Sequence, residues 1–191
     1  MRYLFGGILS LLMLSCTAPS LDVCLNTGDT EEYRVVKTET RLEAQSRDAT
    51  VKVMASSGGQ IAVGTGTVYR YEGHNIVVTA AHVIGEPPYL VAVLTQYEYV
   101  MAEVVYFDSE MDLAVLVIPD VPGLSSMPFR PAPERSIKIG TDVLYSGFPN
   151  DGELFTIRGY ITALHPSGEV YLHSYAWPGS SGSSGFDSRG R

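Results

Sequence analysis

Cysteine is nearly absent from this chain of 191 residues. Its two cysteines, Cys16 and Cys24, both lie close to the N-terminus, so no disulfide can form within the long remainder of the chain. A small domain held together by disulfides is therefore excluded. No Cys/His spacing typical of a metal site occurs either. We expect neither a metal nor another cofactor.

Basic residues are also scarce. The chain has 13 Lys and Arg against 21 Asp and Glu, a formal net charge of −8. Such a charge does not favour binding to a phosphate backbone, so nucleic acid is not expected as a partner. Charged residues make up only 18% and hydrophobic residues 45%, which excludes a disordered acidic tail. The sequence predicts a folded protein with a sizeable core.

An apolar run long enough to cross a bilayer is missing. Residues 3–14, which follow Arg2, are apolar and small but too few to span a membrane. This pattern is typical of a secretory leader, here residues 1–15, and predicts export to the cell envelope. Residues 11–16 (LLMLSC) resemble a bacterial lipobox, in which Cys16 would become the lipidated first residue. An ordinary cleaved leader with an incidental cysteine remains the alternative.

Lipidation would anchor the protein to a membrane through acyl chains. Thr17 follows the cysteine where some lipoproteins have aspartate, and the resemblance to Gram-negative lipoproteins implies the outer membrane, facing the periplasm. Residues 16–47 are polar and contain turn signals at 18–20 and 26–30, which predicts a tether and a lead-in. Within it, residues 31–44 fit a short helix, an extra strand or, best, a solvated segment.

After Asp48 the pattern changes to short runs rich in Val, Ile, Thr and Tyr, bounded by Gly, Pro and Asn. Such a pattern is typical of an all-β sandwich or barrel. It predicts six strands in a first barrel, residues 48–120, at 50–55, 61–71, 75–79, 89–95, 98–108 and 113–118. After a proline-rich joint it predicts four more strands in a second barrel, residues 131–191, at 142–148, 155–164, 170–175 and 183–186.

Three segments place reactive side chains next to buried strands or glycine turns. Residues 75–84 (NIVVTAAHVI) lead a β-branched strand into a turn that presents His82. Residues 110–118 (EMDLAVLVI) set Asp112 before another apolar strand, and residues 177–183 (WPGSSGS) present Ser181 in a glycine-flanked turn.

The order His, Asp, Ser in these contexts resembles the trypsin-like serine proteases of the chymotrypsin fold, closest to the bacterial HtrA/Deg type without a PDZ domain. The resemblance covers residues 51–187. It implies an all-β protease domain, residues 48–191, of two six-stranded antiparallel β-barrels, with a polypeptide as substrate. Only four strands are predicted for the second barrel, so its last two are lacking, and we expect the chain to be incomplete or catalytically weak.

The chemistry explains these residue types. A serine hydroxyl needs a base within hydrogen-bond reach, and an imidazole with a pKa near ~6.5 suits that task. His82 fits the base, and Asp112 fits the carboxylate that orients the other ring nitrogen. The backbone N–H groups of Gly179 and Ser181 would form the oxyanion hole.

Two assignments have competitors. Asp108 also ends a strand, although the run that begins at Asp112 matches the family better. The sequence Gly-Ser-Ser-Gly occurs twice, so Ser184 competes with Ser181. In the family a Pro-Gly pair precedes the nucleophile's motif and an apolar-acidic pair follows, which favours Ser181. Ser180 and Ser183 depart from the family pattern.

Specificity and activity leave further alternatives. Tyr175 stands where trypsin-type enzymes hold an acid at the pocket floor, so a preference for Lys or Arg is not supported, and a small or apolar P1 residue is expected. A protease-fold pseudoenzyme or binding lipoprotein of the cell envelope is the main alternative. A purely structural lipoprotein and an acyl hydrolase are the others, but the α/β-hydrolase order would be Ser, Asp, His.

Overall fold

The computed structural model describes residues 40–191. The predicted leader, Cys16, Cys24 and most of the predicted tether lie outside the described residues. The strands in chain order are β1 (Thr50–Ser57), β2 (Gln60–Tyr71), β3 (His74–Thr79), β4 (Tyr89–Leu94), β5 (Tyr99–Asp108), β6 (Leu113–Ile118), β7 (Asp142–Gly147), β8 (Phe155–Leu164) and β9 (Val170–His173). The helices are α1 (Arg41–Asp48), α2 (Ala81–Ile84) and the short 3₁₀ turns η1 (Glu134–Ser136) and η2 (Pro149–Asp151).

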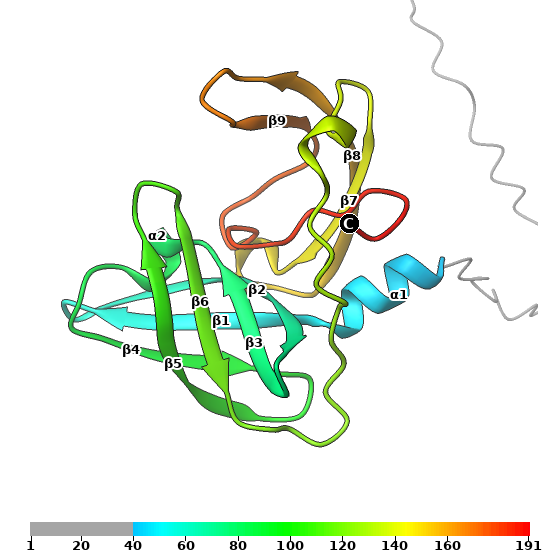
Figure 1. The fold of residues 1–191 in the computed structure, drawn as a ribbon. Coiled ribbons are helices and arrows are strands. Elements are labelled where there is room, and N and C mark those ends of the chain that lie inside the picture. The colour runs from blue at the N-terminus through cyan, green and yellow to red at the C-terminus, as the bar shows by residue number, and fades with distance from the viewer. Residues whose placement is uncertain (1–39) are drawn as a thin grey trace, which may run out of the picture. The chain divides into compact units, whose positions relative to one another are not determined.

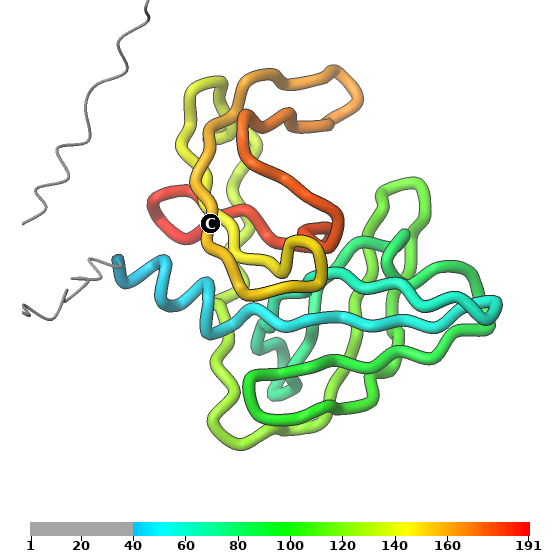
Figure 2. Tube along the Cα trace, turned by 180° about the vertical axis from the view of Figure 1, so that it is seen from behind, coloured from blue at the N-terminus to red at the C-terminus, as the bar shows by residue number. Residues whose placement is uncertain are grey.

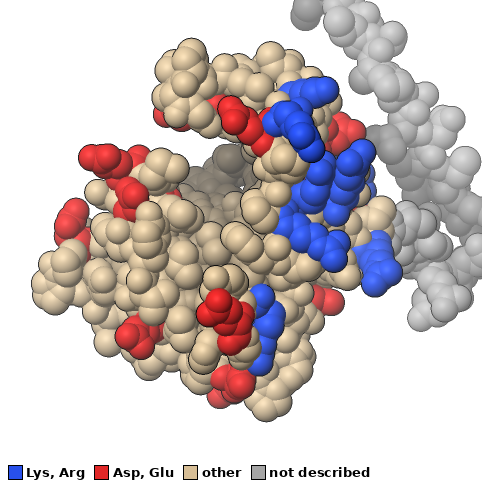
Figure 3. Space-filling view, in the orientation of Figure 1, with Lys and Arg blue, Asp and Glu red and all other residues tan. Residues whose placement is uncertain are grey.

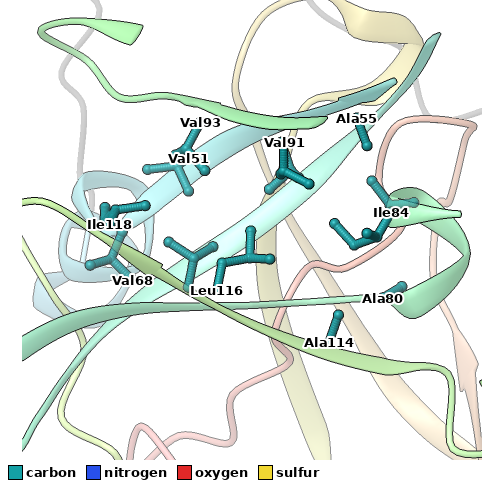
Figure 4. Close-up of a cluster of buried hydrophobic side chains, with 13 residues drawn as sticks. Val51, Ala55, Val68, Ala80, Ile84, Val91, Val93, Ala114, Leu116 and Ile118 are labelled. Atoms are coloured by element: carbon teal, nitrogen blue, oxygen red, sulfur yellow. The ribbon is translucent and has the colours of Figure 1, made fainter. Parts of the chain in front are cut away.

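The first six strands form a closed antiparallel barrel in the order β1-β2-β3-β6-β5-β4 (Figure 1). All six predicted strands are present. Strand β1 illustrates why the sequence predicted these strands, because its side chains alternate between the barrel interior and the outside. Val51, Val53 and Ala55 are 1%, 0% and 2% exposed. Valines of this kind, with Leu116 and Ile84, fill the barrel interior (Figure 4).

The same core holds helix α2 at one end of the barrel. Its residues Val83 and Ile84 are buried in the interior cluster, and Ala81 is buried as well. His82, which lies between Ala81 and Val83, is exposed. Ala80, which starts the turn, also belongs to the cluster and lies near Ile84 in Figure 4. The apolar neighbours of His82 therefore fix its backbone, and the imidazole stays accessible.

The second group of strands forms an open antiparallel sheet, β7-β8-β9. Three of the four strands predicted here are present, and β9 ends at His173 rather than residue 175. The fourth, predicted at 183–186, is reduced to one bridge between Leu144 and Phe186. Serine and glycine fill the rest of that segment and have low strand propensity, so only the apolar Phe186 is drawn into the sheet.

The last segment of the chain connects this sheet to the barrel. Figure 2 shows it running from β9 to the first barrel and then back to the C-terminus. Phe186 and Leu144 are buried with Tyr69 and Met127 in a second apolar cluster. This cluster joins the outside of the barrel to the second sheet, so the region after residue 176 lies against both.

Helix α1 lies at the end of the segment for which a solvated conformation was favoured. Its N-terminus is a capping box, in which Thr40 Oγ1 accepts from the Glu43 N–H and Glu43 Oε2 accepts from the Thr40 N–H. Glu43 also pairs with Arg158 of β8 at 2.8 Å. Hydrogen bonds from the Thr40 backbone N–H and hydroxyl, then from Arg158, lower the pKa of Glu43 to about 2.

The charges of the described residues are unevenly distributed. In the view of Figure 3, basic side chains gather on the side of the second sheet and α1. In the same view the first barrel shows mainly acidic side chains. Arg70 of β2 pairs with Asp120 at 2.8 Å. None of the helices within residues 40–191 is long and apolar enough to cross a membrane.

Candidate active site

His82 and Asp112 lie in direct contact. The Nδ1 atom of His82 is 2.8 Å from Oδ2 of Asp112, and the backbone N–H of His82 donates to Oδ1 at 2.9 Å. Asp112 adopts a φ of 50°, a left-handed conformation that aspartate tolerates better than most residues. One carboxylate thus holds both the backbone and the ring of His82, which leaves Nε2 as the ring nitrogen available for proton transfer.

Asp108, the competing acid, has a different role. Its Oδ1 accepts from the backbone N–H groups of Glu110 and Met111, both at 2.9 Å, and its Oδ2 accepts from the hydroxyl of Tyr106. The hydrogen bond from the Met111 N–H is the largest cause that lowers the pKa of Asp108; desolvation opposes it, and the bonds from Tyr106 and Glu110 lower the pKa further. Asp108 therefore builds the turn that leads to Asp112.

The turn that carries Ser181 is held against strand β2. The Ser181 carbonyl accepts from the Thr65 N–H at 2.8 Å. A side chain at Gly64 would come within 2.6 Å of Val83 and 3.0 Å of the Ser181 carbonyl oxygen. Val83 follows His82 directly, so Gly64 allows the two candidate catalytic segments to approach the same point of β2.

Gly182 is equally constrained. It has a φ of +87°, and a side chain there would collide with the Thr65 carbonyl and the Thr79 hydroxyl and lie 2.9 Å from the Ala80 nitrogen. Ala80 is the N-cap of α2, the helix that carries His82. Glycine is required by both the conformation and the close approach. The Ser181 turn thus lies at the end of the barrel where His82 begins its helix.

Ser184, the competing nucleophile, faces another part of the molecule. Its backbone N–H lies 3.4 Å from the Thr67 hydroxyl. Burial raises the pKa of Tyr69, and a hydrogen bond with the Ser184 side chain acts against this rise. Ser184 therefore lies beside the Thr67–Tyr69 stretch of β2.

The backbone around Gly179 has two unused donors. Within residues 40–191, the N–H groups of Gly179 and Ser181 donate to no protein acceptor, whereas the neighbouring carbonyls are bound. The Pro178 carbonyl accepts from the Asn150 N–H at 2.6 Å, and the Gly179 carbonyl accepts from Thr65 Oγ1 at 2.7 Å. Two free amide N–H groups, separated by one residue in a turn that is fixed through its carbonyls, are the arrangement that binds an oxyanion.

A cavity of about 460 Å³ adjoins this turn. It is lined by Tyr145, Leu172, Ser174, Ala176, Trp177, Pro178, Ser180, Ser181, Ser183 and Gly185. No charged side chain lines it. The Tyr145 hydroxyl donates to the Tyr175 carbonyl and so fixes the chain between the lining residues Ser174 and Ala176. The buried hydroxyls of Ser174, Ser180 and Ser183 have no hydrogen-bond partner in the described part of the chain.

Sequence reasoning missed three residues that hold the Ser181 turn or the adjoining loop of residues 148–151. Thr65 lies in the small-residue run Gly64-Thr65-Gly66 of β2 and bonds both Gly179 and Ser181. Asn150 follows the Gly147-Phe148-Pro149 segment, and its bond to Pro178 had no signal. Lys52 contacts the loop of Asn150 through Asp151, although it looks like an ordinary solvent-facing lysine.

The comparisons agree with this geometry. Residues 64–191, more than half of the chain, match the family model described as the trypsin-like peptidase domain. The chain belongs to this family, and the family prediction is confirmed. No curated protein sequence matches the chain.

Two bacterial proteases of known structure are similar to it. The serine endoprotease from Yersinia pestis has a TM-score of 0.66 and 24% identity over 78% of this chain and 53% of that one. The Rv3671c protease from M. tuberculosis, in its active form, has a TM-score of 0.64 and 23% identity over 79% of this chain and 70% of that one. The chain thus spans about half the length of the Yersinia protein, and both likenesses establish the fold. The predicted all-β protease architecture is confirmed.

Proposed function

We propose that this protein is an exported serine endopeptidase in which Ser181, His82 and Asp112 form the catalytic triad. The observation that carries the proposal is the pair of hydrogen bonds between Asp112 and His82, at 2.8 and 2.9 Å. The Ser181 turn is held on the neighbouring stretch of β2. Membership of the trypsin-like peptidase family supports it.

In this mechanism the Ser181 Oγ attacks the carbonyl carbon of the scissile peptide bond while His82 Nε2 takes its proton. Asp112 holds the Nδ1–H tautomer and stabilises the imidazolium. His82 then gives the proton to the leaving amine, the C–N bond breaks, and an acyl-enzyme ester remains on Ser181. Water, deprotonated by His82, attacks this ester, and the proton returns to the Ser181 oxygen as the acid product leaves.

The negative oxygen of each tetrahedral intermediate would accept from the N–H groups of Gly179 and Ser181. Because such donors are fixed before the charge develops, losing one can cost about 10²–10³ in rate. The uncharged cavity beside them would take the P1 side chain. A small or apolar P1 residue fits its uncharged walls.

A serine-directed fluorophosphonate probe and casein as an unstructured substrate test this assignment. Wild-type protein and Ser184→Ala should be labelled and should hydrolyse casein, whereas Ser181→Ala should do neither. Ser184→Ala is the matched control because it removes the same group from the second Gly-Ser-Ser-Gly sequence. Labelling that persists in Ser181→Ala but is lost in Ser184→Ala would refute the assignment of the nucleophile.

A second candidate is a protease-fold binding lipoprotein with little or no turnover. The side chains of His82 and Asp112 are 58% and 50% exposed, so water screens the stabilisation of a charged imidazolium. The same probe separates the candidates, because a binding protein without an activated serine would not be labelled in the wild type.

The proposed cellular location rests on residues that lie outside the described part of the chain. We infer export through the leader 1–15 and lipidation at Cys16, with the outer membrane as the favoured site and the domain facing the periplasm. The wild type should incorporate labelled fatty acid and partition with membranes, and Cys16→Ser should do neither. A product that is soluble and unlipidated in the periplasm would refute the anchor and leave the proposed protease activity unaffected.

A further inference from the structure

The amide of Gly179 is oriented from outside its own turn. A peptide C=O and the N–H of the same unit point in opposite directions. The bond from the Asn150 N–H to the Pro178 carbonyl therefore turns the Gly179 N–H away from the loop of residues 148–151. The packing is tight, because a side chain at Gly179 would collide with the Phe148 carbonyl oxygen and lie 3.2 Å from the Asn150 nitrogen.

The 148–151 loop has an unusual backbone. Asn150 and Asp151 adopt φ values of 53° and 56°, two consecutive left-handed conformations. Asparagine and aspartate tolerate this region better than most residues with side chains, but left-handed residues usually occur singly. We therefore expect a contact from a rigid element to help maintain the loop.

Lys52 of the barrel strand β1 supplies that contact. Its Nζ lies 2.6 Å from Asp151 Oδ1 and donates to the Asp151 carbonyl at 3.0 Å. It also lies over the Phe148 ring, 5.1 Å from the centroid. The ammonium thus contacts the first and last residues of the loop, on either side of Asn150. The Lys52 side chain is only 14% exposed, whereas the Asp151 side chain is 59% exposed, so the ion pair is shielded from solvent on the Lys52 side.

Thr65 provides a second tie from the same face of the barrel. Lys52 and Thr65 are directly paired residues of β1 and β2, so their side chains point to the same side of the sheet. Thr65 Oγ1 accepts from the Phe148 N–H at 3.1 Å and donates to the Gly179 carbonyl at 2.7 Å. This pair forms a platform beneath both the 148–151 loop and the Gly179 turn.

We propose that Lys52 is a positioning residue, which holds the 148–151 loop so that the Asn150 N–H keeps the Gly179 amide directed at the oxyanion. The proposal rests on the proposed function. Lys52 touches no reacting atom in this scheme. Its loss should therefore raise the barrier of the chemical step and leave substrate binding in the ground state unchanged.

Lys52→Met removes the charge and keeps most of the apolar stem. We expect kcat for a peptide substrate to fall at least about tenfold, towards the 10²–10³ range for losing one oxyanion donor, with KM nearly unchanged. Lys52→Arg should retain most of the activity. Lys138→Met is the matched control, because Lys138 is exposed and has no ion pair among the described residues.

A double-mutant cycle tests whether Lys52 acts through Asp151. Asp151→Asn should also lower kcat. The double variant Lys52→Met/Asp151→Asn should be no slower than the slower single variant, because both changes break the same ion pair. Effects that multiply would show that the two residues act separately and would overturn the proposal. A wild-type kcat for Lys52→Met would also overturn the proposal. So would an equal fall in kcat for Lys52→Met and Lys138→Met.

A readout without turnover keeps this test separate from the proposed function. The sequence has two Pro-Gly pairs, so labelling proline carbonyl carbon and glycine nitrogen selects only the Gly123 and Gly179 amides in NMR spectra. Lys52→Met should shift or split the Gly179 signal and leave Gly123 unchanged. Lack of probe labelling in the wild type would refute the protease proposal alone. An unchanged Gly179 signal in folded Lys52→Met protein would refute the positioning role alone.

Discussion

Substituting Gly182 by alanine tests how the Ser181 turn is seated on the first barrel. An alanine at a left-handed φ of +87° costs roughly 1–2 kcal/mol. Its Cβ would also press on the Thr65 carbonyl, the Thr79 hydroxyl and, at 2.9 Å, the Ala80 nitrogen. Forcing extra atoms into such a packed site costs about 1–3 kcal/mol more. We expect Gly182→Ala to lower the free energy of unfolding by about 2–5 kcal/mol, a large share of a typical domain's stability.

Gly140→Ala separates the two contributions. Gly140 has nearly the same φ, +84°, but a side chain there would meet nothing within 4 Å. Its substitution should cost only the conformational part, about 1–2 kcal/mol. Urea denaturation of the two variants and the wild type, with equal m-values, measures both losses. If Gly182→Ala were no less stable than Gly140→Ala, the close contact between the Ser181 turn and the barrel would be refuted.

Two further predictions concern Asp112 and Glu43. Asp112→Asn should leave the fold intact but lower kcat by about 10²–10⁴, because the amide no longer fixes the His82 tautomer. Steady-state kinetics measure this fall. A loss below tenfold would contradict the role of Asp112 in orienting His82. The folded pKa of Glu43, about 2, lies below its ordinary 4.5, so its stabilisation is present above pH 4.5 and is lost as the pH falls towards 2. Glu43→Gln should therefore be less stable than the wild type at pH 7, by about 1 kcal/mol, and the two should converge in acid, as thermal unfolding across pH can measure. A gap that stays constant down to pH 2 would contradict this.

The first barrel was predictable because its strands are rich in β-branched residues, because some of them, such as β1, alternate between buried and more exposed side chains, and because turn residues separate them. The second sheet was harder, since the 183–186 segment has only Phe186 to pair with Leu144. Helix α1 carried a readable signal, the Thr40 to Glu43 spacing of a capping box, but the surrounding charge favoured a solvated segment.

The candidate site divides in the same way. His82, Asp112 and Ser181 stand in local contexts that a sequence can display, and the geometry brings the first two into contact. Two supports of the Gly179 turn, Lys52 and Thr65, lie more than a hundred positions before it in the chain. Lys52 and Thr65 acquire their roles only when β1 and β2 pair and the second sheet packs on them. No local pattern encodes such contacts.

The proposed catalytic groups are divided between two differently built parts of the described chain. The proton-transfer pair belongs to a closed barrel with its own interior, whereas Ser181 belongs to a segment held against that barrel by a few hydrogen bonds and by Phe186 in the second apolar cluster. A protein built in this way can lose hydrolysis by local detachment long before its barrel melts. Under the proposed function, warming should therefore abolish hydrolysis before the barrel unfolds, at a temperature set by the stability of the Ser181 segment.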